Sequence, residues 1–329
     1  MSGTPPRVGA CKWSQPRSDG GAGRLCVTFH FVNASDVAGP RRGEGIPLRT
    51  ALVEASDRLR EAGVPDPDVD AELLAAHVLD LSRGGVQAKV VLGAVIDAVD
   101  AAELAALVAR RAAREPLQHV TGRAPFRSLE LLVGPGVLVP RPETELVAQL
   151  AIDALRAVPE PEPVAVDLGT GSGAIALALA TEVPHARVFG VELSPEALAW
   201  ARRNVERVGA PGLELVEGDL ADALPELDGA VSVVVSNPPY VPAAMVPADP
   251  EVHRFDPAVA LYGGEDGLDV IRVLSRRAFV LARPGGVLVI EHAEHQSAPI
   301  ADLLRADGWR AVAHHRDLTG RDRATTALR

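Results

Sequence analysis

The chain has 329 residues, of which 47% are hydrophobic and 23% are charged, a globular composition that excludes extensive disorder and favours two domains. Its net charge of −11 argues against a protein that coats nucleic-acid backbones, because such a protein needs a clustered basic excess. No apolar run has the length needed to span a bilayer, so we expect no membrane partner.

Residues 1–46 differ in composition from the rest of the chain. They hold six basic and three acidic residues, so they carry +3 while the remainder carries −14. Gly, Pro, Ser and Arg dominate residues 1–24 without any helical or strand period, which predicts a disordered leader or a start codon placed upstream of the true one. Both cysteines, Cys11 and Cys26, lie here, so no disulfide framework or cysteine metal site supports the remainder.

A short apolar run, Leu25–Val32, leaves a second interpretation of the leader open: a signal peptide cleaved near Ala34. The run is at the lower length limit for such a segment and contains His30. We therefore favour the disordered leader and a cytoplasmic protein.

Residues 47–116 are predicted to form a small antiparallel helical bundle with short connections. Apolar residues recur at helical spacing from Leu48 to Ala62, and Gly63 follows where a C-terminal cap belongs. Three further helices are expected, at about residues 70–81, 86–99 and 100–116. Asp100 is the expected capping residue of the last helix. The bundle is the natural candidate for recognising a substrate.

Residues 117–140 are predicted to be a hairpin linker of two short strands, because apolar residues alternate there among glycines and prolines. Five arginines crowd this hinge and the helix before it, with only Glu115 opposing them: Arg110, Arg111, Arg114, Arg123 and Arg127. A solvated face is the expected role of such a run, and docking of an acidic or RNA-bearing partner is the alternative.

From residue 141 to residue 329, alternating helices and strands predict a doubly wound α/β sheet, with a ligand at the carboxyl ends of its parallel strands. A helix is expected at about 142–157, and strands at 164–167, 187–191, 213–216 and 231–235. Two last strands, near 310–315 and 324–328, should complete the sheet, one of them antiparallel.

A glycine-rich segment, Gly169–Gly173, follows the first of these strands and precedes a helix. Glycine is needed at such a turn because a side chain would keep a ligand away from backbone N–H groups at the helix start. Glu192, at the end of the next strand, can accept hydrogen bonds from two neighbouring ribose hydroxyls. The pattern Gly169-x-Gly171-x-x-Ala174 also satisfies the dinucleotide fingerprint, so a nicotinamide oxidoreductase is an open alternative at this point.

Ser236-Asn237-Pro238-Pro239-Tyr240 follows the fourth strand and is the most informative segment of the chain. Its two prolines fix the backbone and remove two donors, so carbonyl groups are what the segment offers. The Asn237 side-chain carbonyl and the Pro238 backbone carbonyl can accept both hydrogens of one planar NH2 group, against which Tyr240 places a flat face. The segment is predicted to hold a primary amide or an exocyclic amine.

An amide nitrogen is a poor nucleophile, because its lone pair is delocalised. Two carbonyl acceptors favour pyramidalisation and direct the lone pair at an electrophile. If the glycine loop holds S-adenosylmethionine, the sulfonium methyl can be placed in line for direct displacement. Catalysis would then rest on positioning and on stabilising the developing charge, with no metal.

Several further motifs are spread along the chain: Phe126–Glu130, Val139–Glu145, Tyr262–Asp269, Pro284–Gly286, Glu291-His292 with Gln296, and Asp317–Arg323. With the two segments above they occur in the order typical of the release factor glutamine methyltransferase family (PrmC, also called HemK), which the chain resembles from Pro47 to its C-terminus. The resemblance implies an α/β protein, with a small N-terminal helical bundle and a Rossmann-like, seven-stranded methyltransferase domain.

The family transfers a methyl group from S-adenosylmethionine to the side-chain amide nitrogen (N5) of the glutamine in the Gly-Gly-Gln motif of class-I peptide chain release factors. The resemblance implies that activity, cofactor and protein partner for this chain. It implies cofactor contacts from Gly169, Thr170, Gly171, Ser172, Gly173, Glu192, Asp219, Leu220 and Asn237. It makes Asn237, Pro238 and Tyr240 catalytic, and the same three residues with Pro239 line the acceptor slot.

Three positions depart from the family's usual pattern. Glu192 replaces the more usual Asp, Leu220 stands where some members carry an aromatic residue, and Thr121-Gly122 replaces an Ile-containing hinge sequence. The carboxylate at position 192 preserves the predicted ribose contact, whereas Leu220 gives no aromatic surface for adenine stacking.

A group of carboxylates and histidines near the C-terminus resembles a set of metal ligands: Glu291, His292, Glu294, His295, His314 and His315. Glu291 and His292 end the strand that follows Pro284–Gly286. Structural hydrogen bonding at the sheet edge is therefore the favoured interpretation, and we predict no metal.

Three alternatives to a glutamine methyltransferase agree less well with the sequence. An adenine-N6 methyltransferase acting on DNA or RNA needs base flipping and a backbone-binding surface, which the acidic body of the chain does not favour. A nicotinamide oxidoreductase leaves the Asn-Pro-Pro-Tyr segment unexplained, and a non-enzymatic docking protein would need neither segment. We expect a monomer that takes a protein substrate and has no direct nucleic-acid partner.

Overall fold

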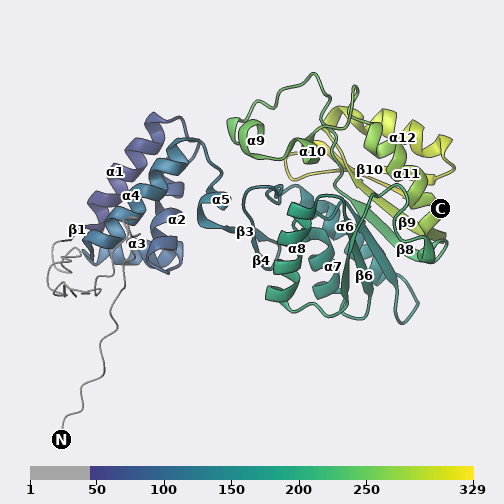
Figure 1. The fold of residues 1–329 in the computed structure, drawn as a ribbon, viewed down its shortest axis with the longest axis horizontal. Coiled ribbons are helices and arrows are strands. Elements are labelled where there is room, and N and C mark those ends of the chain that lie inside the picture. The colour runs from purple at the N-terminus through teal and green to yellow at the C-terminus, as the bar shows by residue number, and fades with distance from the viewer. Residues whose placement is uncertain (1–44) are drawn as a thin grey trace, which may run out of the picture. The chain divides into compact units, whose positions relative to one another are not determined.

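The computed structural model describes residues 45–329 of the chain (Figure 1). The predictions for the leader, including the possible signal peptide and both cysteines, therefore lie outside the described residues. The described residues fall within one structural unit.

Four helices and a short two-stranded ribbon form the N-terminal bundle (Figure 1). They are β1 (Ile46–Pro47), α1 (Leu48–Glu61), α2 (Pro67–Val78), α3 (Arg83–Val91), β2 (Val95–Ile96) and α4 (Ala98–Ala112). Leucines from three helices are buried in its aliphatic core: Leu48 and Leu59 of α1, Leu74 of α2 and Leu104 of α4.

The structure corrects two predictions for this bundle. The helix expected at 86–99 ends at Val91, because Gly93 adopts a left-handed φ of +70° and the chain then pairs Ile96 with Ile46 in the ribbon. The last helix is capped by Asp97 rather than by Asp100. The Asp97 Oδ1 accepts hydrogen bonds from the N–H groups of Val99 at 2.9 Å and Asp100 at 3.0 Å.

A short helix and a hairpin follow the bundle: α5 (Leu117–Thr121), β3 (Arg123–Phe126) and β4 (Leu129–Leu132), the two strands being antiparallel. The turn between the strands places Arg127 at a left-handed φ of +52°. Its N–H donates to Glu145 Oε1 at 2.9 Å and its guanidinium contacts Glu182 at 2.5 Å. Arg127 is therefore a structural residue of the hinge, not part of a solvated face.

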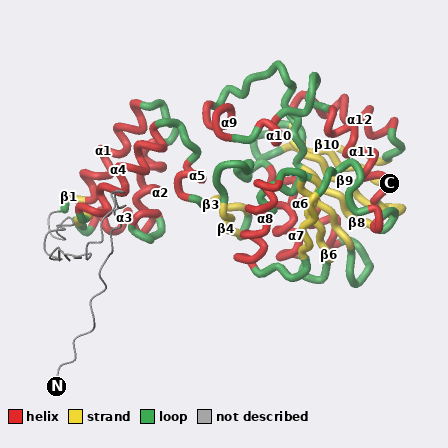
Figure 2. The backbone as a smooth tube through the Cα atoms, viewed as in Figure 1, coloured by secondary structure: helices red, strands yellow, loops and turns green. Residues whose placement is uncertain are grey.

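The C-terminal part contains a seven-stranded sheet with helices on both sides (Figure 2). Its strands are β5 (Val164–Leu168), β6 (Arg187–Glu192), β7 (Leu213–Glu217), β8 (Val231–Ser236), β9 (Ala282–Glu291), β10 (Arg310–Arg316) and β11 (Asp322–Leu328). The spatial order is β10-β11-β9-β8-β5-β6-β7, and β11 runs opposite to the other six strands. The predicted Rossmann-like, seven-stranded domain is confirmed.

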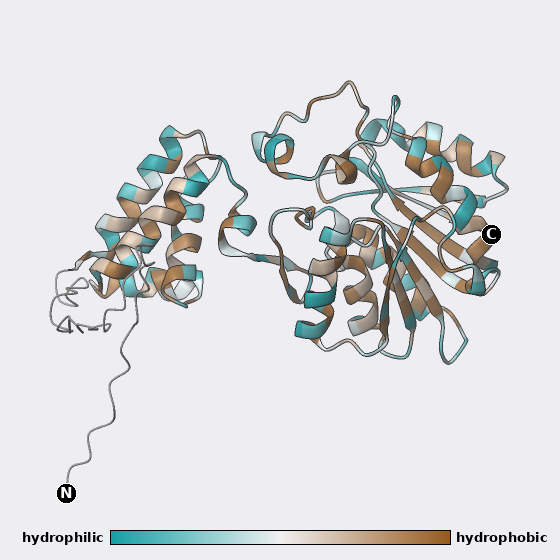
Figure 3. Ribbon diagram, viewed as in Figure 1, coloured by the Kyte–Doolittle hydropathy of each residue, from teal (hydrophilic) through white to brown (hydrophobic). Residues whose placement is uncertain are grey.

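The helices of this part are α6 (Thr144–Arg156), α7 (Ala174–Glu182), α8 (Pro195–Val208), α9 (Pro250–Phe255), α10 (Ala258–Leu261), α11 (Asp269–Leu281) and α12 (Ser297–Ala306). Alternate residues of the strands enter two separate cores, so Val233 packs with α6 and α7 while Val234 packs with α11 and α12. Figure 3 shows the strands as predominantly hydrophobic. Both faces of the sheet are thus covered, as a parallel sheet requires.

Local sequence signals set the ends of α8. Ser194 caps its start by accepting a hydrogen bond from the Ala197 N–H at 3.3 Å, and Pro195 occupies the first turn. Gly209 ends the helix at a φ of +72°. None of the helices among residues 45–329 is long and apolar enough to cross a membrane.

The chain reverses its direction of strand addition between β5 and β8, which are neighbours in the sheet. In doubly wound folds the ligand lies at the carboxyl ends of the strands at such a point. Gly169 follows β5 and Asn237 follows β8, so the fold brings the two predicted functional segments together.

Candidate active site

Three glycines shape the loop after β5. Gly169, Gly171 and Gly173 adopt φ values of +78°, +58° and +84°, and a Cβ at position 169 or 171 would meet no other atom within 4 Å. Steric crowding by the protein therefore does not require glycine at these two positions. Backbone conformation does, and it leaves an open cradle beside the loop.

The loop's N–H groups are nearly all engaged within the protein. The N–H groups of Gly169 and Thr170 donate to the Val191 carbonyl, both at 2.9 Å, that of Gly171 donates to Glu192 Oε2 at 2.8 Å, and that of Gly173 donates to the Thr170 carbonyl at 2.8 Å. These bonds occupy four of the five N–H groups of Gly169–Gly173, and the expected access of a ligand to N–H groups at the start of the following helix stays a prediction. A phosphate would find few free donors here, whereas a cationic ligand would meet carbonyl groups.

Asp167 lies beneath the loop and is fully buried. Its Oδ2 accepts hydrogen bonds from the Thr170 hydroxyl at 2.7 Å and the Ala176 N–H at 3.2 Å, while Oδ1 has no partner among the described residues. Burial raises the pKa of Asp167 to about 7, against the two hydrogen bonds, which lower it. Thr170 and Ser172 are also buried.

Glu192 ends β6 and faces the cradle. Its Oε2 accepts from Gly171 and its Oε1 accepts from the Ser194 N–H, both at 2.8 Å. These two bonds fix the carboxylate and still leave each oxygen a lone pair. Glu192 therefore keeps acceptor capacity on both oxygens, and its binding of two adjacent hydroxyls stays a prediction.

A cavity of about 390 Å³ extends from the glycine loop along the ends of β6 and β7. Three carboxylates line it together with an apolar wall: Glu192, Asp219 and Asp269, and Leu193, Leu220, Val259, Val270 and Val273. Among the residues described, no lysine or arginine lines this cavity or the two smaller hollows beside the glycine loop. The electrostatics suit a neutral or cationic ligand with an apolar ring system, and they oppose a pyrophosphate.

A second cavity, of about 160 Å³, opens on the other side of Asn237. Its polar lining comes from Asn237, Arg141, Tyr240, Asp256 and Glu291. This volume is that of a single side chain rather than of a cofactor. Asn237 also lines the hollows beside the glycine loop, so it stands where the two spaces meet.

The other residues of the Asn-Pro-Pro-Tyr segment divide between the two sides. Pro239 lines the larger cavity, of about 390 Å³, and Tyr240 lines the smaller one, of about 160 Å³. Pro238 is buried and its side chain lines neither, so its backbone carbonyl is what it can offer. The Asn237 Nδ2 donates to the Thr144 hydroxyl at 3.2 Å, which directs Oδ1 away from Thr144.

The small cavity contains two buried carboxyls. Asp256 pairs with Arg141 through Oδ2 at 2.5 Å, whereas its Oδ1 has no partner in the described part of the chain. The Tyr240 hydroxyl donates to Glu291 Oε1 at 3.3 Å. Burial raises the pKa of Tyr240, so this hydroxyl stays protonated and remains a donor.

The histidines near the C-terminus make structural hydrogen bonds. His292 contacts the Ala293 carbonyl and the Thr325 hydroxyl, both at 2.8 Å, and His314 contacts the same hydroxyl at 2.9 Å. His315 contacts the Thr326 hydroxyl at 2.9 Å. These bonds link β9, β10 and β11 at the edge of the sheet.

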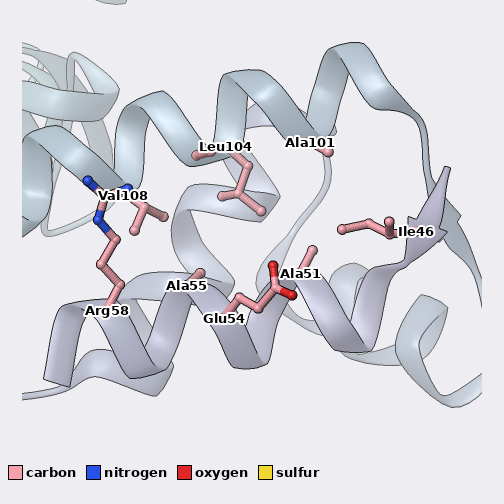
Figure 4. Close-up of a pocket in the computed structure, with 9 residues that line it drawn as sticks. Ile46, Ala51, Glu54, Ala55, Arg58, Ala101, Leu104 and Val108 are labelled. Carbon is pink, nitrogen blue, oxygen red and sulfur yellow. The ribbon is translucent and has the colours of Figure 1, made fainter. Parts of the chain in front are cut away.

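A separate hollow of about 150 Å³ lies in the bundle between α1 and α4 (Figure 4). Ala51, Ala55, Leu104 and Val108 form its floor, and Glu54 and Arg58 also line it. It contains none of the groups that carry chemistry at the ends of β5 and β8.

The doubly wound sheet, the carboxylate-lined cavity and the Asn-Pro-Pro-Tyr segment beside it define a Rossmann-like methyltransferase, whose cofactor is S-adenosylmethionine. Residues 165–254 accordingly match the model of the Methyltransferase domain family, and residues 50–122 match that of the PrmC N-terminal domain. The chain belongs to the release factor glutamine methyltransferase family. It is 52% identical over 282 residues to the protein of that name from Streptomyces coelicolor, covering 85% of this chain and 97% of the relative.

The relatives of this chain are not all named for the same methyl acceptor. The release factor glutamine methyltransferase of Deinococcus radiodurans is 45% identical, with 86% of this chain and 98% of the relative covered. A 4-amino-L-phenylalanine/4-methylamino-L-phenylalanine methyltransferase from Streptomyces pristinaespiralis is 41% identical, with 86% and 95% covered. The oxidoreductase alternative is wrong, and the adenine-N6 alternative finds no support among these relatives.

Thr144, Arg141, Asp256 and Glu291 are site residues for which the sequence indicated no such role. The sequence did indicate that Val139–Glu145 and Glu291-His292 are motifs of the family. The sequence could not supply the contacts between distant segments, since Thr144 lies 93 residues from Asn237 and Glu291 lies 51 residues from Tyr240.

Proposed function

We propose that this protein transfers a methyl group from S-adenosylmethionine to the N5 side-chain nitrogen of the glutamine in the Gly-Gly-Gln motif of class-I peptide chain release factors. The observation that carries the proposal is that Asn237 lines both the hollows beside the glycine loop and a cavity of one side chain's volume. The names of most of its relatives support the choice of acceptor.

The cofactor would be held by the segments around the larger cavity. Gly169–Gly173 offer the methionine part an open cradle, and Glu192 offers acceptors to the ribose hydroxyls. Asp219 and Leu220 would flank the adenine, with Asp219 held by a 2.9 Å hydrogen bond from the Ala221 N–H. When bound, S-adenosylmethionine supplies an electrophilic methyl group on a sulfonium.

The acceptor amide would be held by Asn237, Pro238 and Tyr240, with Pro239 closing the cofactor side. The Asn237 Oδ1 and the Pro238 carbonyl accept the two hydrogens of the NH2 group, and the Tyr240 ring shapes the slot. These contacts hold the nitrogen between the two cavities and stabilise positive charge as it develops there. The chain's residues thus act by binding and orienting.

We assign different roles to the three parts of the chain, which are the bundle (47–116), the hairpin linker (117–140) and the methyltransferase domain (141–329). The bundle lines none of the described cavities around Asn237, so we assign it to the release factor outside its Gly-Gly-Gln loop. We place the enzyme in the cytoplasm, as a monomer without a direct nucleic-acid partner.

A small aromatic amine is a second candidate acceptor, because the Streptomyces pristinaespiralis relative is named for 4-amino-L-phenylalanine. An amine of that kind also presents an NH2 group to two carbonyl acceptors. The experiment is to incubate the protein and S-adenosylmethionine with a class-I release factor or with 4-amino-L-phenylalanine. Mass spectrometry of the Gly-Gly-Gln peptide should show one added methyl; methylation of the amino acid alone would overturn the proposal.

A further inference from the structure

The proposed function gives no role to two features of the sequence, the Tyr262–Asp269 motif and Gln296. Both contact the backbone of the Asn-Pro-Pro-Tyr segment or of the residue that follows it. Tyr262 forms an isolated parallel bridge with that residue, Val241. Gln296 ends the short 3₁₀ helix Glu294–Gln296 after β9 and is 2% exposed. Two parts of the chain that are distant in the sequence therefore meet at the end of the segment that would hold the acceptor.

The Asn-Pro-Pro-Tyr segment needs such contacts because its own backbone offers few. Pro238 and Pro239 have no N–H group, so neither can donate to a neighbouring strand as the residues of β8 do. Val241 is anchored at both of its backbone groups, since its N–H donates to the Leu261 carbonyl at 2.8 Å and its carbonyl accepts from the Gly263 N–H at 2.9 Å. The path of the chain between β8 and Val241 therefore depends on what holds its carbonyl groups.

Gln296 holds one of these carbonyls. Its Nε2 donates to the Tyr240 carbonyl at 3.0 Å, and its Oε1 accepts from the Ala293 N–H at 3.0 Å. The two ends of an amide have opposite hydrogen-bonding character, so the bond to Ala293 determines that the donor end faces Tyr240. The buried side chain is thus oriented by its own helix and presents a fixed donor to the segment.

Two glycines of the Tyr262–Asp269 motif pack against the same stretch of backbone. A Cβ at Gly263 would lie 2.5 Å from the Pro239 carbonyl oxygen. A Cβ at Gly267 would collide with the Tyr240 carbonyl oxygen and would lie 2.8 Å from Gln296 Nε2. Glycine is therefore required at both positions for the motif to approach this closely. The hydrogen bond between Gln296 and Tyr240 forms in the space that Gly267 leaves.

We propose that Gln296 is a positioning residue, which fixes the backbone at Tyr240 and thereby the acceptor slot, and that Gly267 makes room for this contact. The Tyr240 ring lines the 160 Å³ cavity, and the Pro238 carbonyl lies two residues before it. A displaced Tyr240 backbone would move both groups relative to the acceptor. Neither Gln296 nor Gly267 touches the reacting atoms. The proposal rests on the proposed function, because the slot it concerns is the one assigned to the acceptor.

Two substitutions disturb the Tyr240 carbonyl from different residues. Gln296→Met keeps the length of the side chain and removes its donor. Gly267→Ala places a methyl group where the carbonyl oxygen lies. Because the two variants change different parts of the chain, a common effect on the reaction would come from the contact that they share.

Each substitution has a matched control. Gln149→Met is the control for the first, because the Gln149 side chain also makes two hydrogen bonds, with Arg127 and Asp153, both at 2.8 Å. Gly209→Ala is the control for the second, because Gly209 has a φ of +72°, close to the +78° of Gly267, and open surroundings. Neither control residue contacts the Asn-Pro-Pro-Tyr segment through these bonds.

The first measurement separates kcat from the affinities. Gln296→Met and Gly267→Ala should lower kcat for the release factor by about tenfold to a hundredfold, because the acceptor amide is no longer held in line with the methyl group. In Gln296→Met, KM for the release factor and Kd for S-adenosylmethionine should change little. Both controls should stay close to the wild type. Equal kcat in wild type and Gln296→Met, both folded by circular dichroism, would overturn the proposal.

The second measurement does not depend on the identity of the acceptor. The chain has two tyrosines, and only Tyr240 is followed by valine, so carbon-13 at tyrosine carbonyls and nitrogen-15 at valines give one correlation in a nuclear magnetic resonance spectrum. Loss of the donor should shift the Tyr240 carbonyl resonance upfield in Gln296→Met and leave it in place in Gln149→Met. If the resonance shifts but the wild type methylates no release factor, the proposed function fails and the support of Tyr240 stands. An unchanged resonance in Gln296→Met removes the contact and the proposal with it.

Discussion

The Arg111 guanidinium of α4 lies 2.7 Å from Oε1 of Glu251, a residue 140 positions further along the chain in α9. Arg111 also donates to Asp70 Oδ2 at 2.7 Å, and Arg114 donates to both oxygens of Glu251 at 2.7 and 2.6 Å. The bundle is thereby tied to the segment that follows Asn-Pro-Pro-Tyr. Two of the five arginines expected on a solvated face, Arg111 and Arg114, instead have enclosed side chains in this cluster, whereas Arg110 and Arg123 are largely exposed.

Replacing Glu251 by glutamine should destabilise the protein markedly. Burial acts to raise the pKa of Glu251, but hydrogen bonds from Arg114, Asp249 and Arg111 lower it overall, so the carboxylate is charged wherever the protein is folded. The substitution leaves the nearly buried Arg111 with Asp70 alone and Arg114 with Asp249 alone, at 3.8 Å, and we expect a loss of about 3 kcal/mol in the free energy of unfolding.

Urea denaturation would measure this loss. Asp57→Asn is a suitable control, because Asp57 pairs with Arg60 at the surface, where both side chains are more than half exposed. That control should change the free energy of unfolding by less than about 1 kcal/mol. Equal effects of the two substitutions would contradict a structural role for the Glu251 cluster.

Gly171→Ala should weaken cofactor binding in addition to lowering the stability of the protein. The φ of +58° makes alanine unfavourable by about 1 to 2 kcal/mol, and the new methyl group would also enter the cradle. Gly209→Ala is the matched control, with a φ of +72° and equally open surroundings at the end of α8. Calorimetry with S-adenosylmethionine should show weaker binding only for Gly171→Ala, and similar affinities in both variants would remove the loop from the cofactor site.

Asn237→Ala should abolish methyl transfer while the fold and cofactor affinity persist. The substitution removes one of the two acceptors proposed for the NH2 group, and losses of about a hundredfold or more in kcat are usual when a single polar contact of this kind is deleted. Its hydrogen bond to Thr144 is half-buried, so the cost in stability should be small. Single-turnover measurement at saturating cofactor would test it, and activity close to the wild type would refute the assignment of Asn237.

The sequence was sufficient to predict the elements that local signals determine. The four parallel strands from Val164 to Val235 and the antiparallel last strand lie where their apolar runs indicate. The prediction of a helix at 86–99 was wrong about its end. The apolar period continues across Gly93, but the backbone turns at that residue. The cap was misplaced by three residues because Asp97 and Asp100 are both good capping residues, and only the ribbon before Asp97 decides between them.

The site was predictable only in part, for a different reason. Asn237 and Glu192 are identified by their own neighbours in the sequence, because each ends a strand beside a distinctive motif. The buried position of Glu291 beneath Tyr240 depends on how β8 and β9 pair, and that of Thr144 depends on where α6 starts. Such contacts between distant segments are set by the sheet's order, which no local pattern encodes.

The stability of the protein should depend on pH through Glu291. Burial raises its pKa from 4.5 to about 7, against hydrogen bonds from Thr144 and Tyr240 that lower it, so between these values the folded state holds a proton that the unfolded state has lost. The stabilisation from protonated Glu291 is therefore complete below about pH 4.5 and is lost as the pH rises through about 7. Glu291→Gln resembles the protonated carboxyl at every pH.

The free energy of unfolding of the wild type, relative to Glu291→Gln, should consequently fall between about pH 4.5 and pH 7, by up to about 3 kcal/mol, and then stay constant. Asp167 is present in both proteins, so its own raised pKa cancels in the comparison. Urea titrations of both proteins across this range would give the difference directly. A difference that does not vary with pH would mean that Glu291 ionises as freely in the folded protein as in the unfolded chain, and the enclosed carboxylate beneath Tyr240 would then have to be open to water.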